Sequence, residues 1–351
     1  MTGHRFHVVD VFARDGERFT GNQLAVFHDT ADLPDEDLLA LTRETNFSEC
    51  TFVEGTTDGG YDVRIFDPAE EIPFAGHPTL GTAAVLRELV DGDRDTGGGT
   101  AADGDDTPID HDGDDTPIDR ECDDASTDRD GDELTLNLGV GPIDVWIERV
   151  DDGGPDGDSV ADGVPDRDGG SSVREEYWMR QIPPEFGQTV PAGVAADVLG
   201  LDTAEVDTEY PVQSVSTGLP TLVVPLASVG AVERAATTEP EYGEFIDEYG
   251  GHNVLAFARG GVDGGDLHAR VFADWAGVPE DPATGSAAGC LAGWLLEHGY
   301  LGDGPVAATV EQGYEMGRPS RLRLRADRDP DGEPAIEVGG AVVPVAAGRT
   351  L

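Results

Sequence analysis

Two short glycine-containing turns, each leading into an apolar helix, constrain this chain more than any other feature. The first turn spans residues 74–81 (Phe-Ala-Gly-His-Pro-Thr-Leu-Gly) and leads into the apolar residues 82–86. The second spans residues 281–286 (Asp-Pro-Ala-Thr-Gly-Ser) and leads into residues 287–296, which carry no charge. A helix that is apolar all round has no face for water, so both helices are predicted to be buried. The repeat predicts two similar halves, each built around one central helix.

The start of each predicted helix is a candidate anion site. The first turn of a helix leaves backbone N–H groups unpaired, and the helix dipole adds partial positive charge there. We therefore expect Gly76, His77, Gly285 and Ser286 to receive a carboxylate where the two helix starts face each other. The glycines could equally serve only close helix packing, and the turns alone do not decide between these roles.

Segments typical of strands surround both helices, which indicates an α+β fold. Strands are predicted at 6–12, 22–27, 47–53, 61–66, 133–138, 142–150, 173–182, 212–215, 221–226, 252–258, 267–272, 320–325, 335–338 and 341–346, and further helices at 34–46, 191–199, 229–236 and 242–248. The first half is expected to span residues 1–140 and to be completed by a C-terminal strand at 341–351. The second half is expected at 141–340.

Two acidic segments interrupt this pattern. Residues 91–132 contain sixteen Asp and repeat the sequence Asp-Gly-Asp-Asp-Thr-Pro-Ile-Asp, and residues 151–172 have a similar composition. Such segments bury too little apolar surface to order themselves, so both are predicted to be disordered insertions. Asp110, Asp112 and Asp114 have the spacing of a calcium loop, but Asp115 stands where that loop needs Gly. No metal site is therefore expected.

The charge balance excludes several kinds of partner. The 351 residues include 72 acidic and 22 basic ones, all of the latter Arg, for a formal net charge of −50. The resulting field repels nucleic acids and anionic membranes, so neither is expected as a partner. Acidic residues spread along a whole chain are typical of adaptation to high salt, in which screening limits self-repulsion. An acidic interaction surface is the alternative.

The cysteines and the absent motifs narrow the choice further. Cys50, Cys122 and Cys290 are odd in number and show no Cys-x-x-Cys spacing. Neither a disulfide framework nor a zinc site is indicated, which fits a reducing cytoplasm. The N-terminus lacks the pattern of a signal peptide, and no run has the length of a membrane span. No phosphate-binding Gly-x-x-x-x-Gly-Lys-[Ser/Thr] motif is present, so no nucleotide cofactor is expected.

Seven segments in order resemble the PhzF family of phenazine-biosynthesis-type isomerases, which are relatives of diaminopimelate epimerase. They are the two turns together with residues 9–12, 21–27, 46–53, 216–220 and 312–320. The resemblance covers nearly the whole chain outside the two insertions. It implies the diaminopimelate epimerase-like fold, in which each half is a curled sheet around a central helix and the active site lies between the halves. It also implies a homodimer as the common assembly.

The resemblance further implies a cofactor-free isomerase that moves a proton between carbons of a small carboxylate, as in the isomerisation of dihydro-hydroxyanthranilate. In the matching positions Glu49 is the general acid/base, and His77, Asp281 and Ser286 are the polar groups around it. Gly76, Gly285, Asn22 and Ser216 are the expected substrate contacts.

The local sequence around Glu49 is consistent with that role. Removing a proton from carbon near neutral pH needs a carboxylate with a raised pKa, and Glu49 lies between Phe47 and Phe52. An exposed surface acid is the plain alternative, and Asp281 could simply cap its helix. For the whole protein, a non-catalytic small-molecule-binding protein on the same fold stays open. A racemase with two opposed thiols is a weaker alternative, because neither helix-start turn contains Cys.

Overall fold

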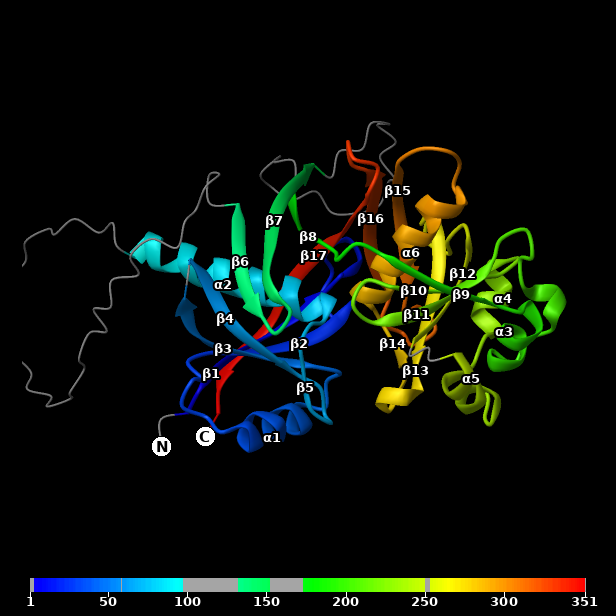
Figure 1. The fold of residues 1–351 in the computed structure, drawn as a ribbon. Coiled ribbons are helices and arrows are strands. Elements are labelled where there is room, and N and C mark those ends of the chain that lie inside the picture. Colours follow the sequence, from blue (N-terminus) through cyan, green and yellow to red (C-terminus); the bar gives the residue numbers. More distant parts are fainter. Residues whose placement is uncertain (1–2, 58, 97–131, 152–172, 250–252, 351) are drawn as a thin grey trace, which may run out of the picture.

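Two halves lie side by side, and each surrounds one helix, α2 in the first half and α6 in the second (Figure 1). The computed structural model describes residues 3–57, 59–96, 132–151, 173–249 and 253–350. The shorter helices lie on the outside, α1 beside the first half and α3, α4 and α5 at the far edge of the second. The expected α+β class is confirmed.

The first half contains β1 (Arg5–Val11), β2 (Asn22–Phe27), α1 (Asp35–Thr45), β3 (Cys50–Thr57), β4 (Gly60–Phe66), β5 (Glu71–Ile72), α2 (Gly76–Thr96), β6 (Glu133–Leu138), β7 (Gly141–Asp151) and β8 (Val173–Arg180). The second half contains β9 (Glu185–Val190), α3 (Ala192–Val198), β10 (Val212–Ser216), β11 (Pro220–Pro225), α4 (Val229–Arg234), α5 (Glu241–Tyr249), β12 (Asn253–Arg259), β13 (Leu267–Ala273), β14 (Val278–Asp281), α6 (Gly285–His298), β15 (Val306–Gln312) and β16 (Ser320–Arg328). The last strand, β17 (Pro334–Arg349), belongs to both, and short 3₁₀ turns span Arg14–Gly16, Thr203–Glu205 and Asp274–Ala276.

Strand β17 joins the two halves into one sheet. Its first part pairs with β16, its middle with β8, and its last part, from Val342 to Arg349, with β1. Figure 1 shows β17 in red, running from the second half into the first. The chain itself crosses between the halves after β8, through residues 181–184. Because β7 and β8 pair in line with β6, the first half extends to residue 180, beyond the expected boundary at residue 140. The halves are therefore connected by backbone pairing as well as by the chain.

Helix α6 is buried from Gly285 to Leu295. Three of its glycines, four residues apart, allow its backbone to pack directly on the rest of the protein. A Cβ on Gly289 would lie 2.9 Å from Cγ of Gln181, and one on Gly293 would lie 2.9 Å from Cβ of Pro184. Since residues 181–184 form the crossover, these glycines hold the helix against the connection between the halves.

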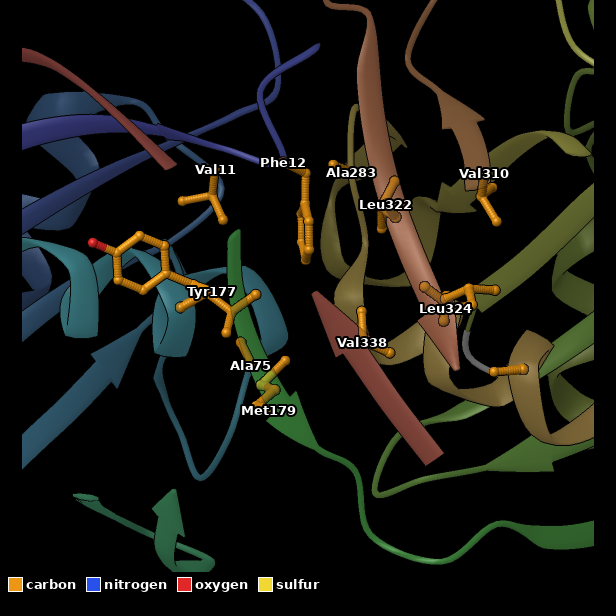
Figure 2. Packing of buried hydrophobic residues seen from close by; sticks show 14 of the residues in the cluster. Val11, Phe12, Ala75, Tyr177, Met179, Ala283, Val310, Leu322, Leu324 and Val338 are labelled. Atoms are coloured by element: carbon orange, nitrogen blue, oxygen red, sulfur yellow. The ribbon is translucent and has the colours of Figure 1, made fainter. Parts of the chain in front are cut away.

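Phe12 fills the junction between the halves. Figure 2 shows its ring with Val11 and Tyr177 on one side and Leu322 and Val338 on the other. The residue is fully buried and adopts a left-handed backbone conformation with φ of 59°. That conformation is strained for an aromatic residue, so packing of the ring must offset its cost.

The structure differs from expectation at α2, which begins at Gly76 rather than after a turn ending at residue 81. Pro78 is compatible with this because the first helical turn has no backbone acceptor for its N–H groups. The helix continues to Thr96, so residues 91–96 are helical and not part of a disordered insertion. The rest of the first predicted insertion up to residue 131, and residues 152–172 of the second, lie outside the described residues.

The two strands predicted at 335–338 and 341–346 are one strand. The pair Gly339–Gly340 resembles a turn in sequence, but its backbone is extended. A Cβ on Gly339 would lie 2.3 Å from the indole of Trp178, and one on Gly340 would lie 2.8 Å from the ring of Phe12. These glycines therefore make room for two aromatic rings. Within the described residues, no helix combines the length and the apolar character needed to cross a membrane.

Replacing Gly76 by Ala is expected to destabilise the protein. A Cβ there would lie 2.8 Å from Cα of Gly285, and backbone can move only by shifting a whole helix. The expected loss is about 1–3 kcal/mol in the free energy of unfolding, measured by urea titration. Gly55→Ala is the matched control because nothing lies within 4 Å of its Cβ position. Equal unfolding midpoints for the two variants would contradict the close approach of the helices.

Candidate active site

The two central helices begin in direct contact. Gly76 is the first residue of α2 and Gly285 the first of α6. A Cβ on Gly285 would lie 3.1 Å from Cα of Gly76 and 3.3 Å from Cζ of Phe12. Glycine at both positions therefore lets the two helix starts meet, with their free N–H groups and positive dipole ends in one place.

Glu49 lies beside this junction, in the short connection between α1 and β3. Asn46 ends α1 in the left-handed conformation and turns the chain towards the junction. A fifth of the Glu49 side chain is exposed, but its Oε2 is buried and has no hydrogen-bond partner among the described residues. Burial raises the pKa of Glu49 to about 7; a hydrogen bond from Ser48 opposes the rise and the charge of Asp67 adds to it. The carboxyl group can therefore gain and lose a proton near neutral pH.

His77, the second residue of α2, faces Glu49. Its Nε2 lies 3.5 Å from Oε2 of Glu49 and, like that oxygen, has no hydrogen-bond partner in the described part of the chain. Burial lowers the pKa of His77 to about 4, against the opposing charge of Asp281 and a hydrogen bond to the backbone of Gln23. The imidazole is therefore neutral near pH 7 and can accept or donate a hydrogen bond at Nε2.

Asp281 approaches the same point from the second half, at the end of β14. Burial and, to a smaller extent, the charge of Glu49 raise its pKa to about 6, against the opposing effects of His77 and of hydrogen bonds from Thr284 and Asn22. The hydroxyl of Thr284 donates to its Oδ2. Two carboxyl groups and one neutral imidazole thus share a small buried volume, which allows protons to be exchanged among them.

Asn22, the first residue of β2, connects the halves through its side chain. Its amide nitrogen lies 2.9 Å from Oδ1 of Asp281, 3.0 Å from the carbonyl oxygen of Ala283 and 3.3 Å from Nδ1 of His77. An amide has two hydrogens, so the two shorter contacts are the hydrogen bonds. Its Oδ1 lies 3.5 Å from the hydroxyl of Ser48. Asn22 thus contacts the segments that carry Glu49, His77 and Asp281.

A cavity of about 280 Å³ opens onto Glu49, Asp281 and Ser286. Most other lining residues are apolar or small, and none of those described is basic: Ser48, Asp67, Pro68, Ile72, Pro73, Phe74, Ala75, Val140, Gly218, Leu219, Asn253, Ala273, Trp275, Ala276, Val278 and Thr284. A negative charge bound here would therefore depend on backbone N–H groups and neutral donors.

The expected substrate contact Ser216 lies at the end of β10, where its hydroxyl accepts a hydrogen bond from the N–H of Gly218. From this segment it is Gly218 and Leu219 that line the cavity. The other expected residues lie together at the junction. Glu49, Asp281 and Ser286 line the cavity, and the remaining four contact these residues or one another without being among its lining residues: Asn22, Gly76, His77 and Gly285.

Among the lining residues that were not expected from the sequence, three carry polar groups: Asp67, Asn253 and Trp275. Asp67 precedes Pro68 and accepts hydrogen bonds from the N–H groups of Ala69 and Glu70, a turn that its sequence could have indicated. The indole N–H of Trp275 donates to Oδ1 of Asn253, at 3.0 Å. Asn253 is the first residue of β12 and Trp275 lies in the 3₁₀ turn after its neighbour β13, so the pair forms only when these strands pair, and no local signal marks it.

Neither of the two cysteines that the structure describes lines the cavity. Cys50, the residue after Glu49, is buried, and burial raises the pKa of its thiol to about 11. Cys290 is buried within α6, and its pKa is also raised by burial. Cys122 lies outside the described residues. Within the described residues, no group of three or more His, Cys, Asp and Glu side chains is arranged to hold a metal ion.

The comparisons with known proteins agree on one family. The model of the phenazine biosynthesis-like protein family, PhzC-PhzF, matches residues 9–99 and 166–348. The trans-2,3-dihydro-3-hydroxyanthranilate isomerase of Pseudomonas aeruginosa is 32% identical over 349 residues, covering 99% of both chains.

Solved structures agree with the sequence relatives. A predicted epimerase from Pseudomonas aeruginosa is 30% identical, with 99% of both chains covered and a TM-score of 0.68. The fold is also that of a Bacillus anthracis phenazine biosynthesis protein of the PhzF family, with 21% identity, full coverage of both chains and a TM-score of 0.75.

The raised pKa of Glu49 predicts a pH-dependent stability. The folded protein keeps the Glu49 proton up to a pH of about 7, whereas the unfolded chain releases it near its ordinary value of about 4.5. The stability from this group is therefore present below about pH 4.5 and lost as the pH rises through 7. Glu49→Gln cannot ionise, so between pH 5 and 8 it should lose about 2 kcal/mol less unfolding free energy than the wild type.

Unfolding titrations with guanidinium at pH 5 and at pH 8 test this difference in stability. The control is Glu44→Gln, which replaces an exposed acid of α1. A Glu49→Gln variant that loses as much stability as the wild type would show that Glu49 is not buried in its neutral form.

Proposed function

The chain belongs to the PhzC-PhzF family of phenazine biosynthesis-like proteins and is an isomerase with the diaminopimelate epimerase-like fold, and we propose that it moves a proton between two carbons of a small carboxylate, with Glu49 as the general acid/base. The contact between Glu49 and His77 carries this proposal. Two buried atoms, Oε2 and Nε2, face each other at 3.5 Å and have no hydrogen-bond partner among the described residues. Unpaired buried polar atoms are costly, and a bound substrate would supply their partners.

The proposed reaction begins with Glu49 ionised. Its carboxylate takes a proton from a carbon of the substrate. The acidic proton on the partly exposed Glu49 exchanges with solvent, and Glu49 then delivers a proton to a second carbon, so the double bonds move. A pKa of about 7 suits both steps, because near neutral pH the carboxylate is basic enough to accept a proton and the carboxyl group is acidic enough to donate one. His77 and Asp281 would hold the substrate's amino or hydroxyl group beside that carboxyl.

The negative charge that develops during the reaction needs hydrogen-bond donors to stabilise it. Removing a proton next to a carboxylate leaves an enolate-like negative charge. Because the described lining residues include no basic side chain, the proposed donors are the backbone N–H groups of Gly76, His77, Gly285 and Ser286 at the two helix starts. Each step uses only groups of this chain, so the proposed reaction is independent of a cofactor.

The substrate class proposed here is a small cyclic carboxylate with amino or hydroxyl groups. The relative from Pseudomonas aeruginosa is named for its action on trans-2,3-dihydro-3-hydroxyanthranilate, which has these groups. The cavity of about 280 Å³ has apolar walls, including Phe74, Leu219 and Trp275, that would pack on the faces of a small ring. This compound is therefore the first candidate substrate.

The working environment proposed for the enzyme is a cytoplasm of high salt. The net charge of −50 and the absence of Lys support this, because self-repulsion of this size is tolerable only when it is strongly screened. A symmetric homodimer is proposed from the resemblance to the family, and light scattering would test it.

Replacing Glu49 by Gln is expected to remove most of the activity. The variant keeps the size of the side chain but cannot take up a proton, so the rate should fall by about 10²–10⁴. The measurement is deuterium incorporation, followed by NMR in D₂O at high salt, into trans-2,3-dihydro-3-hydroxyanthranilate and related carboxylates. Glu44→Gln, with its exposed side chain, should retain the wild-type rate. A Glu49→Gln enzyme as fast as the wild type would contradict the assignment of Glu49 as the general acid/base.

Raising the salt concentration is expected to stabilise the protein. The screening length falls from about 10 Å at 0.1 M to about 3 Å at 1 M, which weakens repulsion among the acidic residues. The urea unfolding midpoint should therefore rise steadily with KCl over this range. Sucrose at matched osmolality is the control for general effects on burial, since it screens no charge. A midpoint that KCl leaves unchanged, or that sucrose raises equally, would contradict adaptation to salt.

A further inference from the structure

The connection between β15 and β16 touches both halves of the site without lining the cavity. It runs from Gln312, the last residue of β15, to Ser320, the first of β16. Neither Gln312 nor Arg318 is among the residues that line the cavity. Both make several hydrogen bonds to segments that carry site residues.

Gln312 holds the segment of Asp281 in the second half. It is 2% exposed, and its Nε2 donates to the carbonyl oxygen of Asp281 at 2.7 Å and lies 3.1 Å from Oγ1 of Thr284. Its Oε1 accepts the N–H of Thr284 at 3.3 Å. The Thr284 hydroxyl in turn donates to the carboxylate of Asp281. One amide thus fixes both the main chain of Asp281 and the residue that donates to its side chain.

Arg318 holds the segment before Asn22 in the first half. Its Nε donates to the carbonyl oxygen of Gly21 at 3.0 Å, and its Nη2 donates to that of Thr20 at 3.1 Å. The same Nη2 lies 2.7 Å from the carboxylate of Asp10, which is 2% exposed. The N–H of Gly21 also donates to the carbonyl oxygen of Pro319, at 3.0 Å. The main chain just before β2 is therefore held in place, and with it the position of Asn22.

Gly313 makes the connection between Gln312 and Arg318 compact. It has a φ of 75°, and a Cβ there would lie 2.4 Å from the carbonyl oxygen of Arg318 and 2.6 Å from that of Pro282. The N–H of Arg318 donates to the carbonyl oxygen of Gly313 at 3.0 Å. Only glycine fits this conformation and this space, so the turn cannot open without losing these contacts.

We propose that Gln312 and Arg318 are positioning residues, which together fix the hydrogen bond between Asn22 and Asp281 across the two halves. That bond, 2.9 Å from Nδ2 to Oδ1, has one end on the segment that Arg318 holds and the other on the segment that Gln312 holds. The proposal rests on the proposed function, because its effect on turnover is exerted through Asp281, His77 and Glu49. Its effect on the titration of Asp281 does not depend on any reaction.

Loss of either side chain should affect turnover more than substrate binding. A displacement of about 1 Å in a catalytic group can cost about 10²-fold in rate. We expect kcat to fall about 10–100-fold in Gln312→Met and Arg318→Lys. We expect KM to stay near the wild-type value, since neither residue lines the cavity. Met removes the hydrogen bonds of Gln312 at similar size, and Lys keeps the charge opposite Asp10 but loses the two-pronged contact with the carbonyl groups.

The matched control is Arg321→Lys. Arg321 comes from the same region and joins loops by ion pairs with Asp15 and Asp263, but it contacts neither Asn22 nor the segment of Asp281. The same substitution at the two arginines therefore separates a specific effect on the site from a general effect of losing a guanidinium group. Thermal unfolding of each variant, followed by circular dichroism, shows that it is folded.

A second measurement needs no substrate. The ring of His77 lies beside Asp281 and Glu49, whose pKa values are about 6 and about 7. In a pH titration its NMR signals should therefore show two inflections from these neighbours, the lower one from Asp281 and the upper one from Glu49. The chain has 8 histidines, and His77→Asn assigns the signal. The Thr284 and Asn22 hydrogen bonds lower the pKa of Asp281, whereas Glu49 raises it. Gln312→Met should weaken the hydrogen bond from Thr284 to Asp281, and Arg318→Lys should weaken the one from Asn22. Either loss raises the pKa of Asp281, so the lower inflection should move to higher pH.

The expected result is lower kcat, unchanged KM and a shifted lower inflection in both variants, with wild-type behaviour in Arg321→Lys. Folded Gln312→Met and Arg318→Lys proteins with the kcat and the His77 titration of the wild type would overturn the proposal, as would equal effects in Arg321→Lys. If Gln312→Met fails to fold, Arg318→Lys decides alone. If the wild type turns over none of the carboxylates tested, the proposed function fails, and the His77 titration still decides whether these residues position Asp281.

Discussion

The contact between Gly76 and Gly285 is the constraint on which the rest of the structure depends. Two helix starts approach to backbone contact only because neither residue has a side chain, and the ring of Phe12 packs beside Gly285. The approach places two positive dipole ends together, which favours nearby carboxylates by about 0.3–1 kcal/mol each in exposed settings. Burial nevertheless dominates at this site, because the pKa values of Glu49 and Asp281 are raised, not lowered. The junction therefore brings protonated acids close to groups that are ready to bind an anion.

This balance relates the structure to the proposed chemistry. Near neutral pH the site holds a neutral imidazole and two carboxyl groups that titrate at about 6 and about 7, so one proton can be gained or lost without a large cost. A carboxylate substrate would add negative charge and favour the protonated acids, while the backbone donors of both helices would stabilise charge formed during the reaction. Asn22 and the connection from Gln312 to Arg318 hold the groups of the two halves in register. The large negative charge of the surface plays no direct part in this arrangement.

Much of the fold followed from local patterns, and the exceptions have physical reasons. The turn at residues 281–286 and the apolar run after it indicated α6 because a helix without charges must be buried. Gly339–Gly340 was misleading, since a glycine pair in sequence does not reveal whether it makes a turn or makes room for Trp178 and Phe12. In the site, the motif around Glu49 was readable, but Trp275 and Asn253 are paired only through tertiary structure. Gln312 and Arg318 act on main-chain atoms of distant segments, which no sequence spacing records.

The proposed role of this junction of two helix starts is to move a proton between carbons of a bound carboxylate. The most direct test is to incubate the wild-type protein with trans-2,3-dihydro-3-hydroxyanthranilate in D₂O at high salt and to follow the proton spectrum with time. We expect the double bonds to move and deuterium to appear at the carbon that receives the proton, without any added cofactor. A substrate that binds, as shown by broadening of its signals, but keeps both its double bonds and its carbon-bound protons would contradict the account.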